Sequence, residues 1–271
     1  MMRYTIRYVS LLAGMLTVFS SCEHKDLCFD HEAHAPKSDV HVKAVYEKEW
    51  EHTCEGGPDW KQYPAWESRF GMEYHELCPD DPDGLRVQVY NEDGTNNILN
   101  VASEGDIVRM RPGEHSLLLY NNDTEYIVFD DMNSFASAKA TTRTRTRASY
   151  AGNPFMGNTA ENTVNAPDML YGNYIESYTA ERKTEIDELP VTMHPLVFTY
   201  LVRYEFSHGL EYVALAHGAL AGMAGAVWLN SGRTSEEAAT ILYDCTVEDF
   251  GAQACVQSFG IPDYPNEHYT A

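Results

Sequence analysis

The first half of the chain carries short runs in which apolar and polar residues alternate. The run at 85–90 reads LRVQVY, and the run at 126–129 reads YIVF. A period of two places the apolar side chains on one face of a β-strand. Turn-forming stretches such as NEDGTN and RPGEH separate the runs, a spacing typical of an antiparallel sandwich. The predicted strands in this half are 40–44, 85–90, 98–101, 107–110, 117–120 and 126–129.

The second half repeats this pattern after a change in composition. Residues 133–166 are rich in Ser, Thr, Asn, Ala and Gly, which predicts a linker between two domains. The segment GALAGMAGAVWL is expected to form a tight loop or helical turn that leads into a strand at 226–229. We therefore predict an all-β protein with two β-sandwich domains, at 40–132 and 167–271. The predicted strands of the second domain are 197–206, 212–216, 226–229, 239–243 and 254–259.

The first 22 residues have the features of a secretory signal that ends in a cysteine. Arg3 and Arg7 precede an apolar run of 11 residues at 9–19. This run is shorter than the roughly 20 residues that a membrane-spanning helix needs. Ser20-Ser21-Cys22 then predicts a bacterial lipoprotein signal at 1–21, with an acylated Cys22 and a polar tether at 22–39. Two alternatives are an ordinary secreted protein and a retained membrane helix.

The charge of the chain excludes some partners. The 41 Asp and Glu outnumber the 19 Lys and Arg, which gives a net charge of −22. Nucleic acid and anionic lipid both attract basic surfaces, so neither is an expected electrostatic partner. The hydrophobic fraction of 44% is sufficient for a sizeable core. Membrane attachment is therefore expected to come from acyl chains, such as palmitate, on Cys22.

The sequence contains no recognisable motif for catalysis or for a bound metal. The GxSxG, HExxH, Walker and CxxC patterns are all missing, and the acidic loops around Gly84 and Gly94 lack the ligand positions of an EF-hand. His24, His31 and His34 lie among acids in the tether, where a solvated segment is a simpler interpretation than a metal site. We expect no enzyme activity, no metal and no cofactor.

The six cysteines, at positions 22, 28, 54, 78, 245 and 255, leave the disulfide pairing open. If Cys22 is acylated, an odd number remains, so at least one of the others is unpaired. Cys54 with Cys78 and Cys245 with Cys255 are the candidate pairs, because an exported protein can form disulfides.

Two further features have both a functional and a simpler interpretation. Arg143, Arg145 and Arg147 alternate with Thr in the predicted linker. They indicate either a site exposed to an Arg-specific protease or a solvated edge segment. Trp60 and Trp66 could form a platform for stacking a sugar, although such aromatic residues more often cap a core.

Several segments, taken in order, resemble lipoproteins of the Bacteroidales fimbrillin-associated group. They are CEHKDLCFDH, RPGEHSLLLYNNDTEYIVF, ATTRTR, LAGMAGAVWL and VQSFGIP. These lipoproteins are similar to anchor subunits of fimbriae. The resemblance implies two transthyretin-like, Ig-like β-sandwich domains, attachment to the outer membrane and a role in anchoring or ending a fimbrial polymer. It carries over one functional residue, Cys22, and no catalytic residue. Similar proteins continue with further strands after FGIP, so the second sandwich is expected to be incomplete.

Three functions are compatible with these features. The favoured one is a lipid-anchored fimbrial anchor or accessory subunit in cell adhesion, located in the outer membrane. Its partner subunits are expected to add a strand beside 254–259, unless the segment 169–175 closes the second sandwich instead. The alternative is a surface lipoprotein that binds a glycan or another nutrient, which would need Trp60 and Trp66 in one concave patch. A hydrolase without a readable motif is the third.

Overall fold

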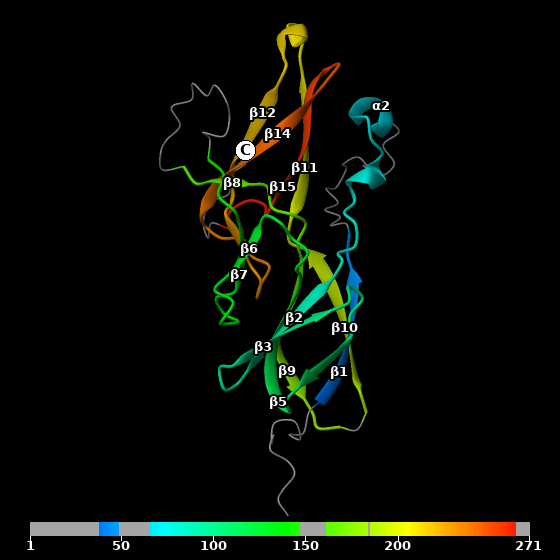
Figure 1. The fold of residues 1–271 in the computed structure, drawn as a ribbon, viewed down its shortest axis with the longest axis vertical. Helices are drawn as coiled ribbons and strands as arrows, with labels where there is room; N and C mark the ends of the chain where they lie inside the picture. Colours follow the sequence, from blue (N-terminus) through cyan, green and yellow to red (C-terminus); the bar gives the residue numbers. More distant parts are fainter. Residues whose placement is uncertain (1–37, 49–64, 147–160, 184, 264–271) are drawn as a thin grey trace, which may run out of the picture. The chain divides into compact units, whose positions relative to one another are not determined.

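The computed structural model describes residues 38–48, 65–146, 161–183 and 185–263. Most of these residues lie in strands that form three sheets (Figure 1). The all-β class predicted from the sequence is therefore confirmed. The described residues include three short helices: α2 (Trp66–Phe70), η2 (Tyr74–Leu77) and η4 (Leu210–Tyr212). No helix in the described part of the chain has the length and apolar character needed to cross a membrane.

The largest sheet has seven strands in the order β3-β2-β5-β9-β10-β1-β4. All neighbouring pairs are antiparallel except β1 and β10, which run parallel. Its strands are β1 (Ser38–Tyr46), β2 (Leu85–Asn91), β3 (Asn96–Val101), β4 (Ile107–Met110), β5 (Gly113–Asn121), β9 (Tyr171–Ala180) and β10 (Asp187–Pro195).

The second sheet has the order β11-β15-β14-β12, and β8 pairs with β14. The N-terminal part of β14 pairs with β12 and β8, whereas only its last three residues pair with β15. The sheet therefore separates into two groups of strands, β11–β15 and β12–β14–β8. The bounds are β8 (Thr163–Asn165), β11 (Phe198–Glu205), β12 (Ala216–Ala224), β14 (Ala238–Glu248) and β15 (Gly251–Ser258).

The third sheet is small and has the order β13-β7-β6. Its inward side chains include Ala140 and Val227, which are at most 1% exposed. Its outer face carries charged side chains, which are described below. The strands are β6 (Ile127–Asp130), β7 (Lys139–Thr142) and β13 (Ala226–Trp228).

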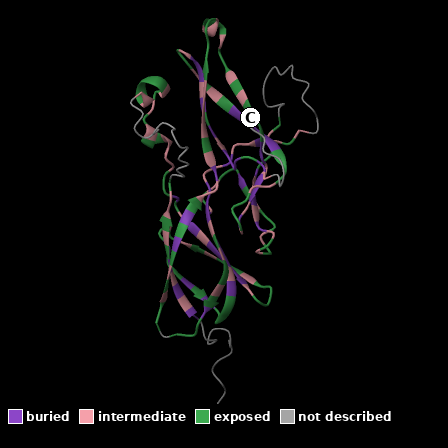
Figure 2. Ribbon diagram, turned by 180° about the vertical axis from the view of Figure 1, so that it is seen from behind, coloured by how far each residue is buried: buried purple, intermediate pink, exposed green. Residues whose placement is uncertain are grey.

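Three clusters of buried side chains stabilise these sheets. Figure 2 shows the buried residues in purple along the strands. The first core contains side chains from both edge strands of the seven-stranded sheet, including Val108 of β4 and Leu99 of β3. This sheet therefore curls around the first core. The middle core lies between β5, the three-stranded sheet and the segments around Leu170 and Phe259. The third core joins β11 and β15 to β8, β12 and β14.

Strand pairing crosses the domain boundary expected from the sequence. The strands β9 and β10 follow the predicted linker, yet β9 pairs with β5 and β10 pairs with β1. The segment 169–175, considered as a closing strand for the second sandwich, thus contributes to the seven-stranded sheet instead. Two strands, β7 and β8, also lie inside the predicted linker. Whether 40–132 and 167–271 behave as separate folding units stays a prediction.

Two local predictions were wrong. The glycine- and alanine-rich segment is the strand β12 and not a loop, because its small side chains fit closely against β14. A Cβ atom at Gly218 would lie 2.1 Å from the Tyr243 ring. The predicted strand at 212–216 is mostly a turn that includes η4. The short helices α2 and η2 lie in the first half of the chain, where the alternating pattern predicts only strands.

Candidate functional site

The strand β11 has an open edge along its whole length. Its eight residues pair with β15, from Phe198 opposite Ser258 to Glu205 opposite Gly251. On its other side, β11 pairs with no strand among the described residues. An exposed strand edge of this length is a template on which another chain can add a strand.

The register shows which backbone groups face the open edge. The N–H of Phe206 donates to the carbonyl of Phe250, immediately beyond the paired region. In an antiparallel pair, alternate residues direct both backbone groups to the partner. Phe198, Tyr200, Val202 and Tyr204 therefore bond to β15. The N–H and C=O groups of Thr199, Leu201, Arg203 and Glu205 point to the open edge.

This edge differs from the one expected from the sequence. The prediction placed an unpaired edge beside 254–259, but β11 occupies one side of β15 in full. The other side of β15 pairs with β14 at Gly251–Gln253 only. The side chains of Ala254 and Val256 belong to the third core. Among the described residues, the strand that presents a complete open edge is β11, which the sequence predicted as a strand but not as an edge.

The outer face of β11 and β15 holds the helix α2. Arg203 and Gln253 are opposite each other in the register, and their side chains donate to the carbonyls of Arg69 and Phe70, respectively. Arg203 also lies with its guanidinium carbon 3.4 Å from the centre of the Phe250 ring. A segment between β1 and β2 is thus fastened to the β11–β15 group, a contact that no pattern in the sequence predicts.

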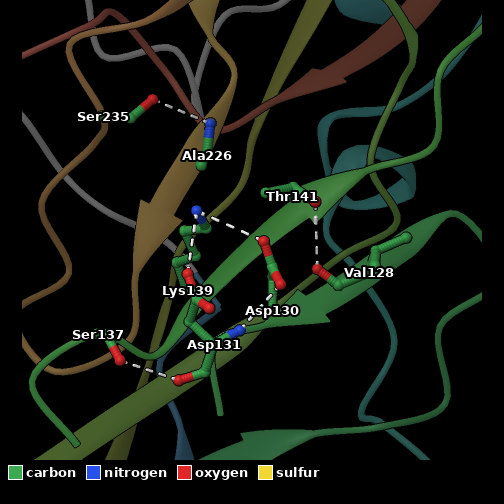
Figure 3. A network of polar contacts seen from close by, with 8 residues as sticks. All are labelled: Val128, Asp130, Asp131, Ser137, Lys139, Thr141, Ala226 and Ser235. Carbon is green, nitrogen blue, oxygen red and sulfur yellow. Dashed lines mark hydrogen bonds and ion pairs between the residues drawn. The ribbon is translucent and has the colours of Figure 1, made fainter. Parts of the chain in front are cut away.

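The outer face of the three-stranded sheet carries a network centred on Lys139 (Figure 3). Its Nζ lies 3.4 Å from Oδ2 of Asp130 and 3.4 Å from Oδ2 of Asp131. Although desolvation opposes its charge, the two carboxylates raise the pKa of Lys139. Lys139 also lies 5.8 Å from the centre of the Trp228 ring. Asp130 ends β6 and Asp131 follows it, so the network joins the end of β6 to the start of β7.

The structure constrains two of the three arginines predicted as protease-exposed. The backbone N–H of Arg143 donates to Tyr126, and that of Arg145 donates to Thr163. The Arg145 side chain also forms an ion pair with Asp244 at 3.1 Å. Partial burial opposes ionisation of Asp244, but the hydrogen bonds from Arg145 and His217 lower its pKa. Arg147 lies outside the described residues.

Several other predicted residues also lie outside the described part, among them Cys22, Cys28, Cys54, Trp60 and the three tether histidines. Trp66 packs against Phe70 and Tyr74 in the α2–η2 segment, with ring centres 4.7 and 5.5 Å away. Trp66 is therefore engaged within its own segment. In the described residues, no group of three or more His, Cys, Asp or Glu is arranged to hold a metal ion.

The candidate disulfide between Cys245 and Cys255 is not formed, because both thiols are free. Thr246 lies opposite Gln253, so Cys245 and Cys255 face opposite sides of the β14–β15 pair. Cys245 packs against the third core, whereas Cys255 is exposed. Burial raises the pKa of both thiols, so neither is an activated nucleophile.

One relative with a named role aligns with a large part of the chain. It is the Bacteroides ovatus protein named "Putative fimbrium anchoring subunit Fim4B", which is 27% identical over 173 residues. The alignment covers 63% of this chain and 50% of the relative, so the chain spans about half the length of the curated relative that it matches. This similarity confirms the predicted resemblance to fimbrial anchor proteins.

Two crystal structures from Bacteroides ovatus share the fold. One is described as a "putative adhesin", with a TM-score of 0.61, 22% identity, and coverage of 88% of this chain and 73% of that chain. A second structure described in the same words has a TM-score of 0.51 and 9% identity, with coverage of 87% and 73%. A family model, "Domain of unknown function (DUF5119)", matches residues 62–244. The chain therefore belongs to the DUF5119 family.

Proposed function

We propose that this protein is an anchoring or accessory subunit of a bacterial fimbrium, held in the outer membrane by a lipid on Cys22. The observation that carries the proposal is the alignment with a protein named as a fimbrium anchoring subunit. The signal-like segment at 1–21, which ends in Ser20-Ser21-Cys22, supports the lipid anchor. The role is adhesive and structural, and it needs no cofactor.

In this proposal the partner is another fimbrial subunit, and it docks by adding a strand to β11. The proposal assigns the seven-stranded sheet and the strands around the third core to the two transthyretin-like sandwiches that the resemblance implies. The open edge of β11 supports docking here, because Thr199, Leu201, Arg203 and Glu205 direct their backbone groups away from β15. Main-chain hydrogen bonds to these groups would supply affinity, and alternate side chains would supply specificity.

The lipid anchor is tested by mass spectrometry of the mature N-terminus. We expect an acylated residue 22 in the wild-type protein. Cys22→Ser should leave the precursor uncleaved and release the protein from the outer-membrane fraction. An unmodified N-terminus at a residue other than 22 would reject the lipid anchor.

The docking edge is tested with two substitutions at one position. Leu201→Pro removes an outward N–H and places a ring at the edge, but it breaks no bond to β15. Leu201→Ala shortens the same side chain and keeps the N–H. We expect Leu201→Pro to abolish co-purification with fimbriae from the native host, whereas Leu201→Ala retains it. Equal co-purification of the two folded variants would reject docking at β11.

A further inference from the structure

The strand β1 is held on both sides. Seven of its residues, Val40 to Tyr46, pair in parallel with Asp187 to Met193 of β10. Four residues at its start, Ser38 to His41, pair with β4 in the antiparallel direction. It is also the first described strand after the segment that the proposed function attaches to the membrane.

Buried side chains fix β1 between its neighbours. Val40 and Val42 are 0% exposed and belong to the first core. At Gly105 the backbone passes so close to β1 that a Cβ atom there would lie 2.1 Å from the carbonyl oxygen of Val42. The N–H of Val42 in turn donates to the carbonyl of Asp106 at 3.1 Å. Axial movement of β1 would disrupt this packing as well as the strand pairing.

Ion pairs join β1 to both neighbouring strands. Arg109 of β4 donates two hydrogen bonds to Asp39, at 2.6 and 3.0 Å. Lys43 contacts Glu188 of β10 at 2.6 Å. These pairs are partly exposed, so each adds less than the buried packing does.

The short connection from β10 to β11 determines the direction in which force would act on the β1–β10 pair. After Pro195, the chain reaches β11 through only Leu196 and Val197. A pull on the start of β1 acts toward its N-terminus, and a pull on β11 acts on β10 toward its C-terminus. Because β1 and β10 are parallel, the two pulls are opposed along a common axis. All seven residue pairs then resist together, as in shear, instead of separating one after another.

We infer that the β1–β10 pair is a mechanical clamp that resists tension between the membrane anchor and a fimbrial subunit docked on β11. The inference rests on the proposed function for the origin of the tension. It assigns the parallel pairing a role beyond folding, since the strand that leads to the membrane and the strand that leads to the docking edge are direct neighbours.

The test is single-molecule pulling on the full chain in two geometries. One handle is at the N-terminus, and the second is an azide-bearing residue at either Thr199 or Ile186, which are both exposed. Pulling at Thr199 loads β1 and β10 in shear. Pulling at Ile186, next to the start of β10, peels the two strands apart from one end. At equal loading rate, we expect a higher rupture force with the handle at Thr199. Equal forces, or a higher force at Ile186, would overturn the clamp.

A matched pair of core substitutions separates the clamp from general stability. Val42→Ala in β1 and Val89→Ala in β2 each remove two methyl groups from the first core. We expect only Val42→Ala to lower the rupture force in the Thr199 geometry. A similar loss in both variants would overturn the specific role of β1. These measurements do not depend on acylation or fimbriae, so the clamp and the proposed function can fail independently.

Discussion

Arg203 and Gln253 lie opposite each other on β11 and β15 and donate to the last two carbonyls of α2. The carbonyls at a helix C-terminus have no partner within the helix, so external donors must satisfy them. The positive guanidinium also complements the negative end of the helix dipole. This contact ties the long connection between β1 and β2 to the group of strands that presents the candidate docking edge.

Loss of the Arg203 side chain is expected to release α2. Arg203→Ala removes a charged donor and the contact with Phe250, which together should lower the free energy of unfolding by about 1.5–3 kcal/mol. Urea denaturation measures this change. Hydrogen exchange of residues 66–71 should increase more than exchange in β2. Arg233→Ala is the control, because the Arg233 side chain is 69% exposed and pairs with Asp263. An equal effect of the two substitutions would contradict a specific role for Arg203.

Two glycines with similar backbone angles should tolerate alanine differently. Gly105 has φ +101° and lies against the Val42 carbonyl, whereas Gly94 has φ +80° with no atom within 4 Å of a Cβ position. Gly94→Ala should cost only the left-handed strain, about 1–2 kcal/mol. Gly105→Ala adds a clash with β1, so its loss of unfolding free energy should be clearly larger. Similar urea midpoints for the two variants would contradict the close approach of β1.

The Asp244 carboxylate should contribute a pH-dependent part of the stability. Its pKa is lower in the folded protein, so its contribution is complete above the unfolded value of about 4 and is lost as the pH falls through the folded value. Because the Asp244 side chain is 59% exposed, the contribution should be only about 0.2–1 kcal/mol. Asp244→Asn should therefore destabilise the protein at neutral pH and have a diminishing effect in acid. Urea unfolding at several pH values measures this, with Glu211→Gln as the control. A difference that grows in acid would contradict the assignment.

Limited trypsin digestion tests the predicted linker. We expect the first cuts within 143–147, as the sequence predicts. Among these sites, cleavage after Arg143 and Arg145 should be slower than after Arg147, because their backbones are hydrogen-bonded to neighbouring segments. Mass spectrometry of the early fragments identifies the sites. Resistance of these bonds together with cuts within 85–129 would show that the predicted boundary is misplaced.

Alternation in the sequence identified most strands of the first half. LRVQVY became most of β2, the run at 98–101 became part of β3, and the run at 107–110 is the whole of β4. However, the alternating pattern within one strand does not specify which other strand it pairs with. The β1–β10 contact joins Val40 to Asp187, and no feature within either segment specifies the other. The domain boundary predicted at 133–166 relied on amino-acid composition. Composition does not show that β9, which follows this segment, pairs with β5, which precedes it.

The candidate edge shows the same limit. The apolar run at 197–206 predicted β11, but the sequence did not show that β11 would be the outermost strand. Similarly, the alanines and glycines of β12 lack the bulky residues typical of strands, and only the Tyr243 ring across the pair explains why Gly218 is needed. Edge position and close packing arise from tertiary contacts, so they required the structure.

The four residues Leu117–Tyr120 in the middle of β5 alternate between two cores. Leu117 and Leu119 belong to the first core, whereas Leu118 and Tyr120 belong to the middle core, and all four are at most 1% exposed. A one-residue slip of this strand would exchange the contents of both cores at once. A backbone shift of β5 that relieves crowding in one core therefore compresses the other core. The position of this strand couples the volumes of the two cores.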